Sequence, residues 1–335
     1  MKEKRQRSRL WLATILVFAV YFGAWIIAGA GDDRNWIVAI AGTGVTSTLA
    51  PVALIPMALF AIRRRWMDSL ACLGLVGVFL LVSGQMRWPD PQKVPPGTPL
   101  IRVMSFNVEH LRSGAENVAR LVRNEQIDVF AFQECGMGEA ENNIRQLRAL
   151  LPEFQFISDG SRTSGSRLPV LSQRSIPLTN LSYSWTMLEQ VVDLGGQPVR
   201  ILNVHAPSYV PDTTLQRPVL DWLRRWAEVS KEQTDLINVE LDMISENHFP
   251  TVLCGDFNMT PVGRRYSILA SVGRDSFAEA GWGGGWTMPA GLPMRRIDYI
   301  WAFPGVVPQE CHVVDWRASD HAAVVASLAV LAHTR

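Results

Sequence analysis

The sequence is poor in cysteine, and the few cysteines it has are scattered. Its 335 residues include four cysteines, Cys72, Cys135, Cys254 and Cys311, and none of them forms a C-x-x-C pair. Structural zinc sites usually need clustered thiolates, so this class of site is excluded. The spacing is equally compatible with a disulfide and with free buried thiols.

The chain also lacks a strong net charge, although its charge is unevenly distributed. The total is +1, yet residues 1–97 hold 11 of the 32 Lys and Arg residues and 5 of the 31 Asp and Glu residues. The remainder therefore carries 21 basic and 26 acidic residues, a net of −5. Without an overall basic field, a protein that coats nucleic acid is disfavoured, whereas an enzyme with a local cationic site is not.

Long apolar runs are concentrated in the N-terminal third, and no internal repeat is visible. The runs cover 10–30, 36–62 and 69–84. A helix needs about 20 residues to span the ~30 Å hydrocarbon layer, so the first two runs are long enough and the third is marginal. The alternative is a buried helical core. We predict a transmembrane region of about three helices over 10–84, followed by a stiff Pro-rich linker over 85–99.

Basic clusters before the first apolar run and between the second and third runs predict the orientation of this region. The tail 1–9 and Arg63–Arg65 should be cytoplasmic. Three crossings then place the rest of the chain outside the cytoplasm, as a multi-pass protein of the inner membrane. If the first run is instead a signal peptide cleaved after Ala28-Gly29-Ala30, the C-terminal part still lies outside.

From Leu100 onwards, short apolar strands alternate with helices, and a polar residue follows nearly every strand. Strands are predicted at 101–106, 129–132, 199–204, 252–254, 296–301 and 323–328. Helices are predicted at 116–124 and, as one helix or two, over about 213–246. The strand ends should converge on one edge. The polar residues there are Asn107, Glu134, His205, Asp256, Asn258, Asp298, Asp320 and His321.

This set combines hard oxygen ligands with imidazoles. Carboxylate and amide oxygens favour Mg²⁺ or Mn²⁺ over structural zinc. Together with histidine they suit metal-assisted attack of water on a phosphate ester.

Six short motifs in order carry a family resemblance: Ser105-Phe-Asn107, Gln133-Glu134, Asn203-Val-His205, Gly255-Asp-Phe-Asn258, Arg296-Ile-Asp-Tyr299 and Ser319-Asp-His321. The pattern resembles the endonuclease/exonuclease/phosphatase superfamily over about 100–332. The resemblance implies a four-layer α/β sandwich, with two packed β-sheets flanked by helices, after the helical membrane region.

The resemblance also implies a role for each polar residue. Glu134 would be the main metal ligand, with Asn107 beside it and Asp320 completing or approaching the metal site. Asp256 would orient or deprotonate water, and Asn258 would hold the phosphate or the metal shell. His321 would donate to a phosphate oxygen, and Asp298 would fix the tautomer of His321. His205 would be a second catalytic histidine.

The motifs leave the substrate open. The deoxyribonuclease branch pairs its second histidine with a Glu, and Ser164–Ser172 offers none, so His205 acts alone or only binds phosphate. We expect a phosphoester hydrolase acting on nucleic acid, or alternatively on phospholipid headgroups; a non-catalytic binding domain is a third possibility. Apart from the bilayer and the substrate, no protein partner is predicted. Arg264, Arg265, Arg295 and Arg296 are candidate phosphate ligands, and the loop 281–289 could contact a base or a lipid headgroup.

Overall fold

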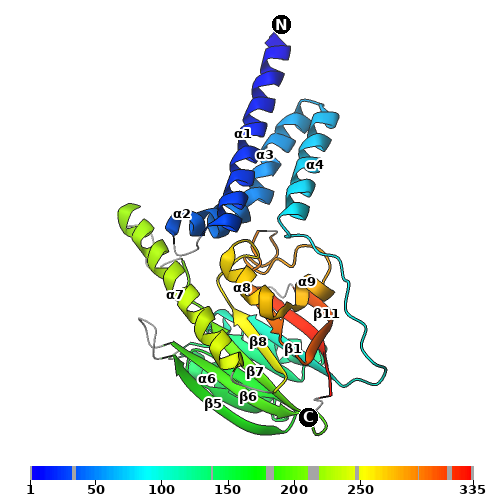
Figure 1. Ribbon diagram of the computed structural model, residues 1–335, viewed down its shortest axis with the longest axis vertical. Helices are drawn as coiled ribbons and strands as arrows, with labels where there is room; N and C mark the ends of the chain where they lie inside the picture. Colours follow the sequence, from blue (N-terminus) through cyan, green and yellow to red (C-terminus); the bar gives the residue numbers. More distant parts are fainter. Residues whose placement is uncertain are drawn as a thin grey trace.

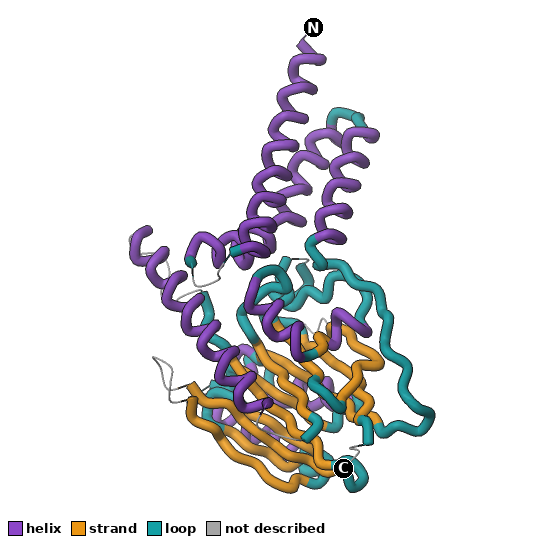
Figure 2. Tube along the Cα trace, in the orientation of Figure 1, coloured by secondary structure: helices purple, strands orange, loops and turns teal. Residues whose placement is uncertain are grey.

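The computed structural model divides the chain into a helical N-terminal region and a mixed α/β domain (Figure 1). Figure 2 shows the strands gathered in the domain and the long N-terminal helices standing on one end of it. The structure describes residues 2–31, 35–136, 139–178, 185–209, 219–245, 249–292, 294–314 and 319–332.

Two six-stranded sheets form the centre of the α/β domain. The first sheet has the strand order β11-β12-β1-β2-β4-β3. Its strands are β1 (Leu100–Asn107), β2 (Val129–Gln133), β3 (Gln155–Ser158), β4 (Thr163–Ser166), β11 (Val306–Val314) and β12 (Ala323–Val330). The second sheet has the order β5-β6-β7-β8-β10-β9. Its strands are β5 (Val170–Leu178), β6 (Trp185–Asp193), β7 (Pro198–His205), β8 (Thr251–Asp256), β9 (Arg274–Asp275) and β10 (Asp298–Ala302).

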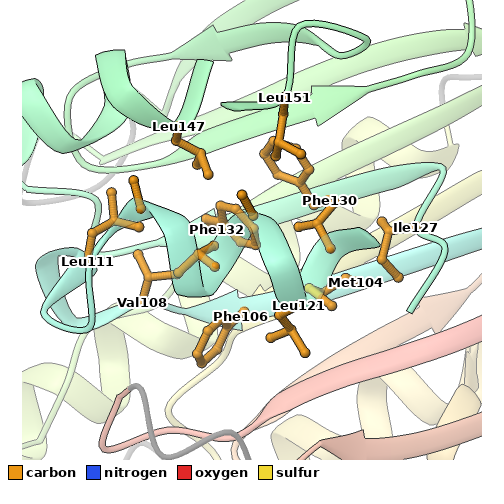
Figure 3. Close-up of a cluster of buried hydrophobic side chains, with 14 of the residues drawn as sticks. Met104, Phe106, Val108, Leu111, Leu121, Ile127, Phe130, Phe132, Leu147 and Leu151 are labelled. Carbon is orange, nitrogen blue, oxygen red and sulfur yellow. The ribbon is translucent and has the colours of Figure 1, made fainter. Parts of the chain in front are cut away.

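Helices cover the outer faces of both sheets, because each sheet is apolar on its outer face as well as its inner one. Phe106, Phe130 and Phe132 of the first sheet pack against apolar side chains that include Leu121 and Leu147 (Figure 3). The helices on this side are α5 (Ala115–Asn124) and α6 (Glu139–Leu150), after the short helix η3 (Glu109–Leu111). The second sheet is covered by α7 (Val219–Ser245) and α8 (Arg264–Val272), with α9 (Ser276–Ala280) following β9.

A third apolar core lies between the two sheets. It joins Ile101 and Val129 of the first sheet to Ile201, Val252 and Cys254 of the second, all of them fully or almost fully buried. The layers are therefore helix, sheet, sheet and helix, and the predicted four-layer sandwich is confirmed. Both sheets are mixed, since β1–β2 and β7–β8 are parallel and the other pairs are antiparallel.

The register brings the polar strand ends to one edge. Asn107 lies opposite Gln133 where β1 and β2 end, and His205 lies opposite Asp256 where β7 and β8 end. Asp298, the first residue of β10, also lies opposite Asp256. The expected convergence at one edge is present. The six predicted strands have bounds within one or two residues of the prediction, whereas β3, β4, β5, β6, β9 and β11 were not predicted.

That edge faces the N-terminal helices. The C-terminus lies at the end of the domain farthest from them (Figure 1), and β12 runs towards it. Strand β1 is antiparallel to β12, with Leu100 opposite Ala329, so β1 runs towards the helices and ends at Asn107 beneath them.

The N-terminal region contains three long helices and a short, irregular segment. The long helices are α1 (Lys2–Ala30), α3 (Leu49–Ile62) and α4 (Trp66–Val82). Between α1 and α3 lie α2 (Trp36–Ala39), the π-helix η1 (Ile40–Val45) and the 3-10 helix η2 (Thr46–Thr48). Residues 9–30 form the one described helix that is long and apolar enough to cross a membrane. The α3–α4 turn lies at the end of this region away from the domain, as does the N-terminus (Figure 1).

The second apolar run is not one long helix, contrary to the length argument made from sequence. It breaks at η1 and η2, leaving 14 residues in α3, about 21 Å of helix, which is shorter than the ~30 Å hydrocarbon layer. Gly42 and Gly44 lie in the break and weaken a regular helix. By contrast, α7 is continuous from Val219 to Ser245, so no break occurs there; its predicted first residues, 213–218, lie outside the described part.

The irregular segment packs directly on the α/β domain. The hydroxyl of Thr260 donates to the carbonyl of Gly42 at 3.0 Å, and Ala39 packs with Tyr209 and Trp226 in a small apolar cluster. A Cβ on Gly42 would lie 3.2 Å from the carbonyl oxygen of Val262. Glycine therefore permits the close approach between this segment and the loop that follows β8.

Gly255 is the position where we expect substitution to damage the fold most. Its φ is +156°, and a Cβ there would lie 1.9 Å from the carbonyl oxygen of Val204. In the full-length protein, Gly255→Ala should lower the free energy of unfolding by about 2–4 kcal/mol, since backbone strain and a backbone clash combine. Gly195→Ala is the control: φ is +63° but nothing lies within 4 Å, so only about 1 kcal/mol should be lost. Equal losses in denaturant titrations would contradict the close-approach explanation.

Candidate active site

An asparagine amide joins carboxylates from the two sheets. Nδ2 of Asn107 donates to Oε1 of Glu134 at 2.9 Å and to Oδ2 of Asp256 at 3.1 Å. Asn107 ends β1 in the first sheet and Asp256 ends β8 in the second. The Asn107 and Asp256 side chains are buried, whereas that of Glu134 is 34% exposed. Glu134 is therefore the carboxylate of this group that solvent reaches.

A histidine and a buried aspartate form a second unit. Nδ1 of His321 lies 2.9 Å from Oδ2 of Asp298, and Nε2 lies 3.8 Å from Oδ2 of Asp256. The predicted Asp298–His321 contact is present, and the Arg295 guanidinium lies against the Met288 sulfur. The Thr287 hydroxyl oxygen accepts hydrogen bonds from the backbone N–H groups of Ile297 and Asp298.

His205 completes the group from the end of β7. Its Nε2 is 3.7 Å from both Oε1 of Glu134 and Oδ2 of Asp256. The ligand atoms of Glu134, His205 and Asp256 all lie within 4.8 Å of one another, and so do those of Asp256, Asp298 and His321. Asp256 thus belongs to both groups. Its Oδ2 is 3.7 Å from Nε2 of His205 and 3.8 Å from Nε2 of His321.

Buried polar residues below these groups tie the sheets together. Nε2 of Gln133 donates to Oδ1 of Asn203 at 2.8 Å, and Nδ2 of Asn203 donates to the Phe132 carbonyl and the Ser164 hydroxyl. The sequence motifs contain Gln133 and Asn203 but predict no role for them. In the structure they link the two sheets beside the site, since Gln133 precedes Glu134 and Asn203 lies two residues before His205.

Two site residues have left-handed backbone conformations. Glu134 has φ +51° and Asn258 has φ +48°. Asparagine tolerates this region, while glutamate does so at a cost of order 1–3 kcal/mol. The His110 N–H donates to the Glu134 carbonyl at 2.7 Å, and the Asn258 N–H donates to Oδ1 of Asp256 at 2.9 Å. These bonds hold both turns, so the strain is maintained where the chemistry would occur.

Burial and the nearby charges shift the pKa values of the two site histidines in opposite directions. Burial alone would lower the pKa of His321, but the carboxylates of Asp298 and Asp256 outweigh it and raise the pKa to about 10. Burial, with the Arg162 and His321 charges, lowers the pKa of His205 to about 4. Burial and the neighbouring Asp298 raise the pKa of Asp256. Arg162, a residue the sequence did not single out, therefore affects His205 electrostatically.

The donor set fits a divalent cation. Glu134 and Asp256 approach the same amide, and two carboxylates held together in this way repel each other unless a cation or a proton intervenes. Their oxygens are hard ligands of the type preferred by Mg²⁺ and Mn²⁺. Glu134, Asp256 and Asn107 are the residues that would hold such an ion.

Asp320 lies at the edge of the site. Its exposed side chain accepts from the Ser319 hydroxyl, its N–H donates to Oε2 of Glu109, and it is in neither group of close ligand atoms among the described residues. Burial raises the pKa of its carboxyl, with the nearby charges of Glu109 and Glu134 contributing. Glu109 therefore lies beside Asp320.

The candidate phosphate-binding arginines separate into different environments. Arg296 is buried and ion-paired with Asp275, so it is structural. Arg265 is buried with its guanidinium 5.5 Å from the centre of the Tyr209 ring, and Arg264 is exposed on α8. Arg295 is half-buried near Asn258 and is the arginine best placed to meet a substrate.

The four cysteines are all buried and unpaired, which resolves the alternative left open by their spacing. Cys135 follows Glu134, and burial is the main reason that its pKa is raised to about 12. These thiols contribute packing rather than disulfides or thiolate ligands.

Comparison with known proteins identifies the family. The model of the endonuclease/exonuclease/phosphatase family matches residues 104–321, so the chain belongs to this family. No curated protein matches the chain.

Solved structures share the fold at low sequence identity. An endonuclease/exonuclease/phosphatase from Beutenbergia cavernae DSM 12333 is 22% identical, with a TM-score of 0.53, over 70% of this chain and 72% of that one. Mannosyl-6-phosphatase from Bacteroides thetaiotaomicron VPI-5482 is 15% identical, with a TM-score of 0.56, over 68% and 99%. D. rerio TDP2 complexed with single-strand DNA product is 17% identical, with a TM-score of 0.54, over 68% and 98%.

The two site histidines should differ in protonation in metal-free protein. At pH 7 we expect His321 to be an imidazolium and His205 a neutral imidazole, because their pKa values move to about 10 and about 4. Ring nitrogen chemical shifts of ¹⁵N-histidine-labelled protein would report both states, with His321→Asn and His205→Asn assigning the signals. Asp298→Asn should lower the pKa of His321. A neutral His321 at pH 7 in the unaltered protein would contradict the electrostatic analysis.

Proposed function

We propose that this protein is a divalent-metal-dependent phosphoester hydrolase whose catalytic domain is held against a membrane by its N-terminal helices. The observation that carries the proposal is that Asp256 is shared by two groups of close ligand atoms, one with Glu134 and His205 and the other with Asp298 and His321. Family membership supports the hydrolase class. The ion, Mg²⁺ or Mn²⁺, is inferred from the donor chemistry.

The residues around Asp256 fit a division of roles in an in-line attack by water. Asp256 accepts a proton from the attacking water as the new P–O bond forms. The bond to the leaving oxygen breaks on the opposite side of phosphorus, where the departing alkoxide takes a proton from solvent, and Asp256 later releases its proton to solvent. His321, protonated near neutral pH, donates from Nε2 to a phosphate oxygen as charge develops there. Asp298 keeps Nδ1 of His321 bonded and so fixes which nitrogen faces the substrate.

The other groups position the substrate. Asn258 lies next to Asp256 and can meet a phosphate oxygen, and neutral His205 lies beside Glu134 as an additional phosphate contact. A cation bound by Glu134, Asp256 and Asn107 would supply Lewis-acid neutralisation of the phosphate charge. We place Asp320 in the outer part of this site, because its carboxylate interacts electrostatically with His321 and Glu134 but is in neither group of close ligand atoms among the described residues.

We further propose an extracytoplasmic location for the catalytic domain. The basic tail and Arg63–Arg65 are at the ends of helices pointing away from the domain (Figure 1), as the charge rule for cytoplasmic loops requires. An apolar helix of sufficient length is present in α1. A multi-pass arrangement additionally needs α3 and α4 to cross, which their shorter lengths permit only with local thinning of the bilayer.

Nucleic acid and phospholipid remain the two substrate classes to compare. Mannosyl-6-phosphatase and TDP2 show that this fold accommodates different phosphoesters in other proteins. A catalytically inert binding domain is the alternative of another class. The retention of both carboxylate–histidine groups opposes it, since a buried carboxylate next to other carboxylates has a free-energy cost that binding alone does not require.

Metal dependence and two substitutions test the hydrolase assignment. Purified full-length protein should cleave bis-p-nitrophenyl phosphate with Mg²⁺ or Mn²⁺ and lose this activity with EDTA. Glu134→Gln and His321→Ala should each lower kcat/KM by at least about 10²-fold. His312→Ala is the matched control. His312 lies on β11, outside the site, and pairs with Glu125 at the end of α5. Metal-independent cleavage, or cleavage equal in all variants, would contradict the assignment.

A further inference from the structure

A cavity lies between the irregular membrane-side segment and the catalytic loop. Its volume is about 250 Å³. Thr43, Gly44 and Thr48 of the N-terminal region line one side, and Asn258 and Arg295 line the other. The cavity therefore has a candidate catalytic residue, Asn258, and residues of the helical region in its walls.

The walls of the cavity are chemically divided. The Tyr209 and Trp226 rings, which are stacked with their centres 4.3 Å apart, and Ile297 supply an apolar surface. Arg295 is the single charged residue among the described residues that line it. The Arg295 Nε is buried and has no hydrogen-bond partner within the described part of the chain. An anionic group beside an apolar one would satisfy both surfaces.

The N-terminal side of the cavity is anchored to the apolar helices. The Thr48 hydroxyl is 2.8 Å from the Tyr21 hydroxyl on α1, and Thr48 directly precedes α3. The Gly42 carbonyl accepts from Thr260, four residues after Asp256. A molecule in the cavity would thus contact the base of the helices that we place in the bilayer and the loop that carries the site.

We propose that this cavity binds the headgroup of a phospholipid from the surrounding bilayer and presents its phosphoester to Asn258 and Asp256. The inference rests on the proposed hydrolase function and names its substrate class. The volume is below the ~300–1,000 Å³ of typical small-molecule pockets, so it suits a headgroup while the acyl chains stay in the membrane. A polynucleotide would need an open groove with several cations along its backbone, which a cavity with one arginine does not supply.

Filling the cavity from the membrane side gives the first test. A Cβ on Gly44 would lie 3.5 Å from the Trp226 ring, so Gly44→Leu places its side chain in the cavity region without a backbone clash. Gly74→Leu on α4 is the matched control, since nothing lies within 4 Å of that position. The protein is reconstituted in nanodiscs of phosphatidylethanolamine, phosphatidylglycerol and phosphatidylcholine with Mg²⁺ or Mn²⁺, and released headgroups are measured by mass spectrometry.

Headgroup release should fall at least about tenfold in Gly44→Leu and stay unchanged in Gly74→Leu, because a misplaced substrate loses rate steeply. The fall should exceed any change in bis-p-nitrophenyl phosphate cleavage measured on the same samples. Ser208→Phe, on the domain side of the cavity, guards against a folding defect in the first variant. Arg295→Gln should also lose lipid turnover, and Arg295→Lys should retain part of it.

The outcomes separate this inference from the proposed function. Metal-dependent aryl phosphodiester cleavage without headgroup release, or headgroup release that is equal in Gly44→Leu, Ser208→Phe and the unaltered protein, would overturn the lipid site and leave the hydrolase assignment intact. Faster cleavage of plasmid DNA or RNA than of lipid, unaffected by Gly44→Leu, would also overturn the lipid site and leave the hydrolase assignment intact. Absence of all metal-dependent cleavage would overturn both.

Discussion

The candidate site depends on the face-to-face packing of two sheets whose polar strand ends must stay within hydrogen-bonding distance. The Asn107 amide is the direct link, since it donates to Glu134 after β2 and to Asp256 at the end of β8. Below it, the Gln133–Asn203 bond makes a second connection between the sheets. A shift of one sheet against the other by the length of one hydrogen bond would separate the carboxylates, so the apolar inter-sheet core and these polar links act together.

Much of this arrangement could be predicted from the sequence because it follows from strand periodicity. Apolar runs that end in Asn107, His205 and Asp256 predict both the strands and the edge where those residues meet. The contact between Asp298 and His321 was expected from the family resemblance, which implies that the aspartate fixes the tautomer of the histidine. Family membership and the layered fold agree with these expectations.

The parts that sequence reasoning missed depend on contacts between distant segments. Arg162 influences His205 and Thr287 holds the start of β10, yet neither lies in a motif. Arg296 follows the loop before β10 and looked accessible, but its partner Asp275 comes from a two-residue strand that no periodicity could reveal. The break in the second apolar run was also hidden, because hydropathy measures length without showing where a helix bends to meet another domain.

That break brings the N-terminal helical region into direct contact with the α/β domain. A continuous helix from Trp36 to Ile62 would expose side chains all round and could not bring a backbone carbonyl to Thr260. The glycine-containing π-helix does so, because Gly42 leaves room for the Val262 carbonyl and turns its own carbonyl towards the catalytic loop. The same irregularity that weakens the segment as a membrane span brings it against the loop that carries Asp256 and Asn258. One local departure from regular helix therefore brings the N-terminal region into contact with the loop beside the candidate site.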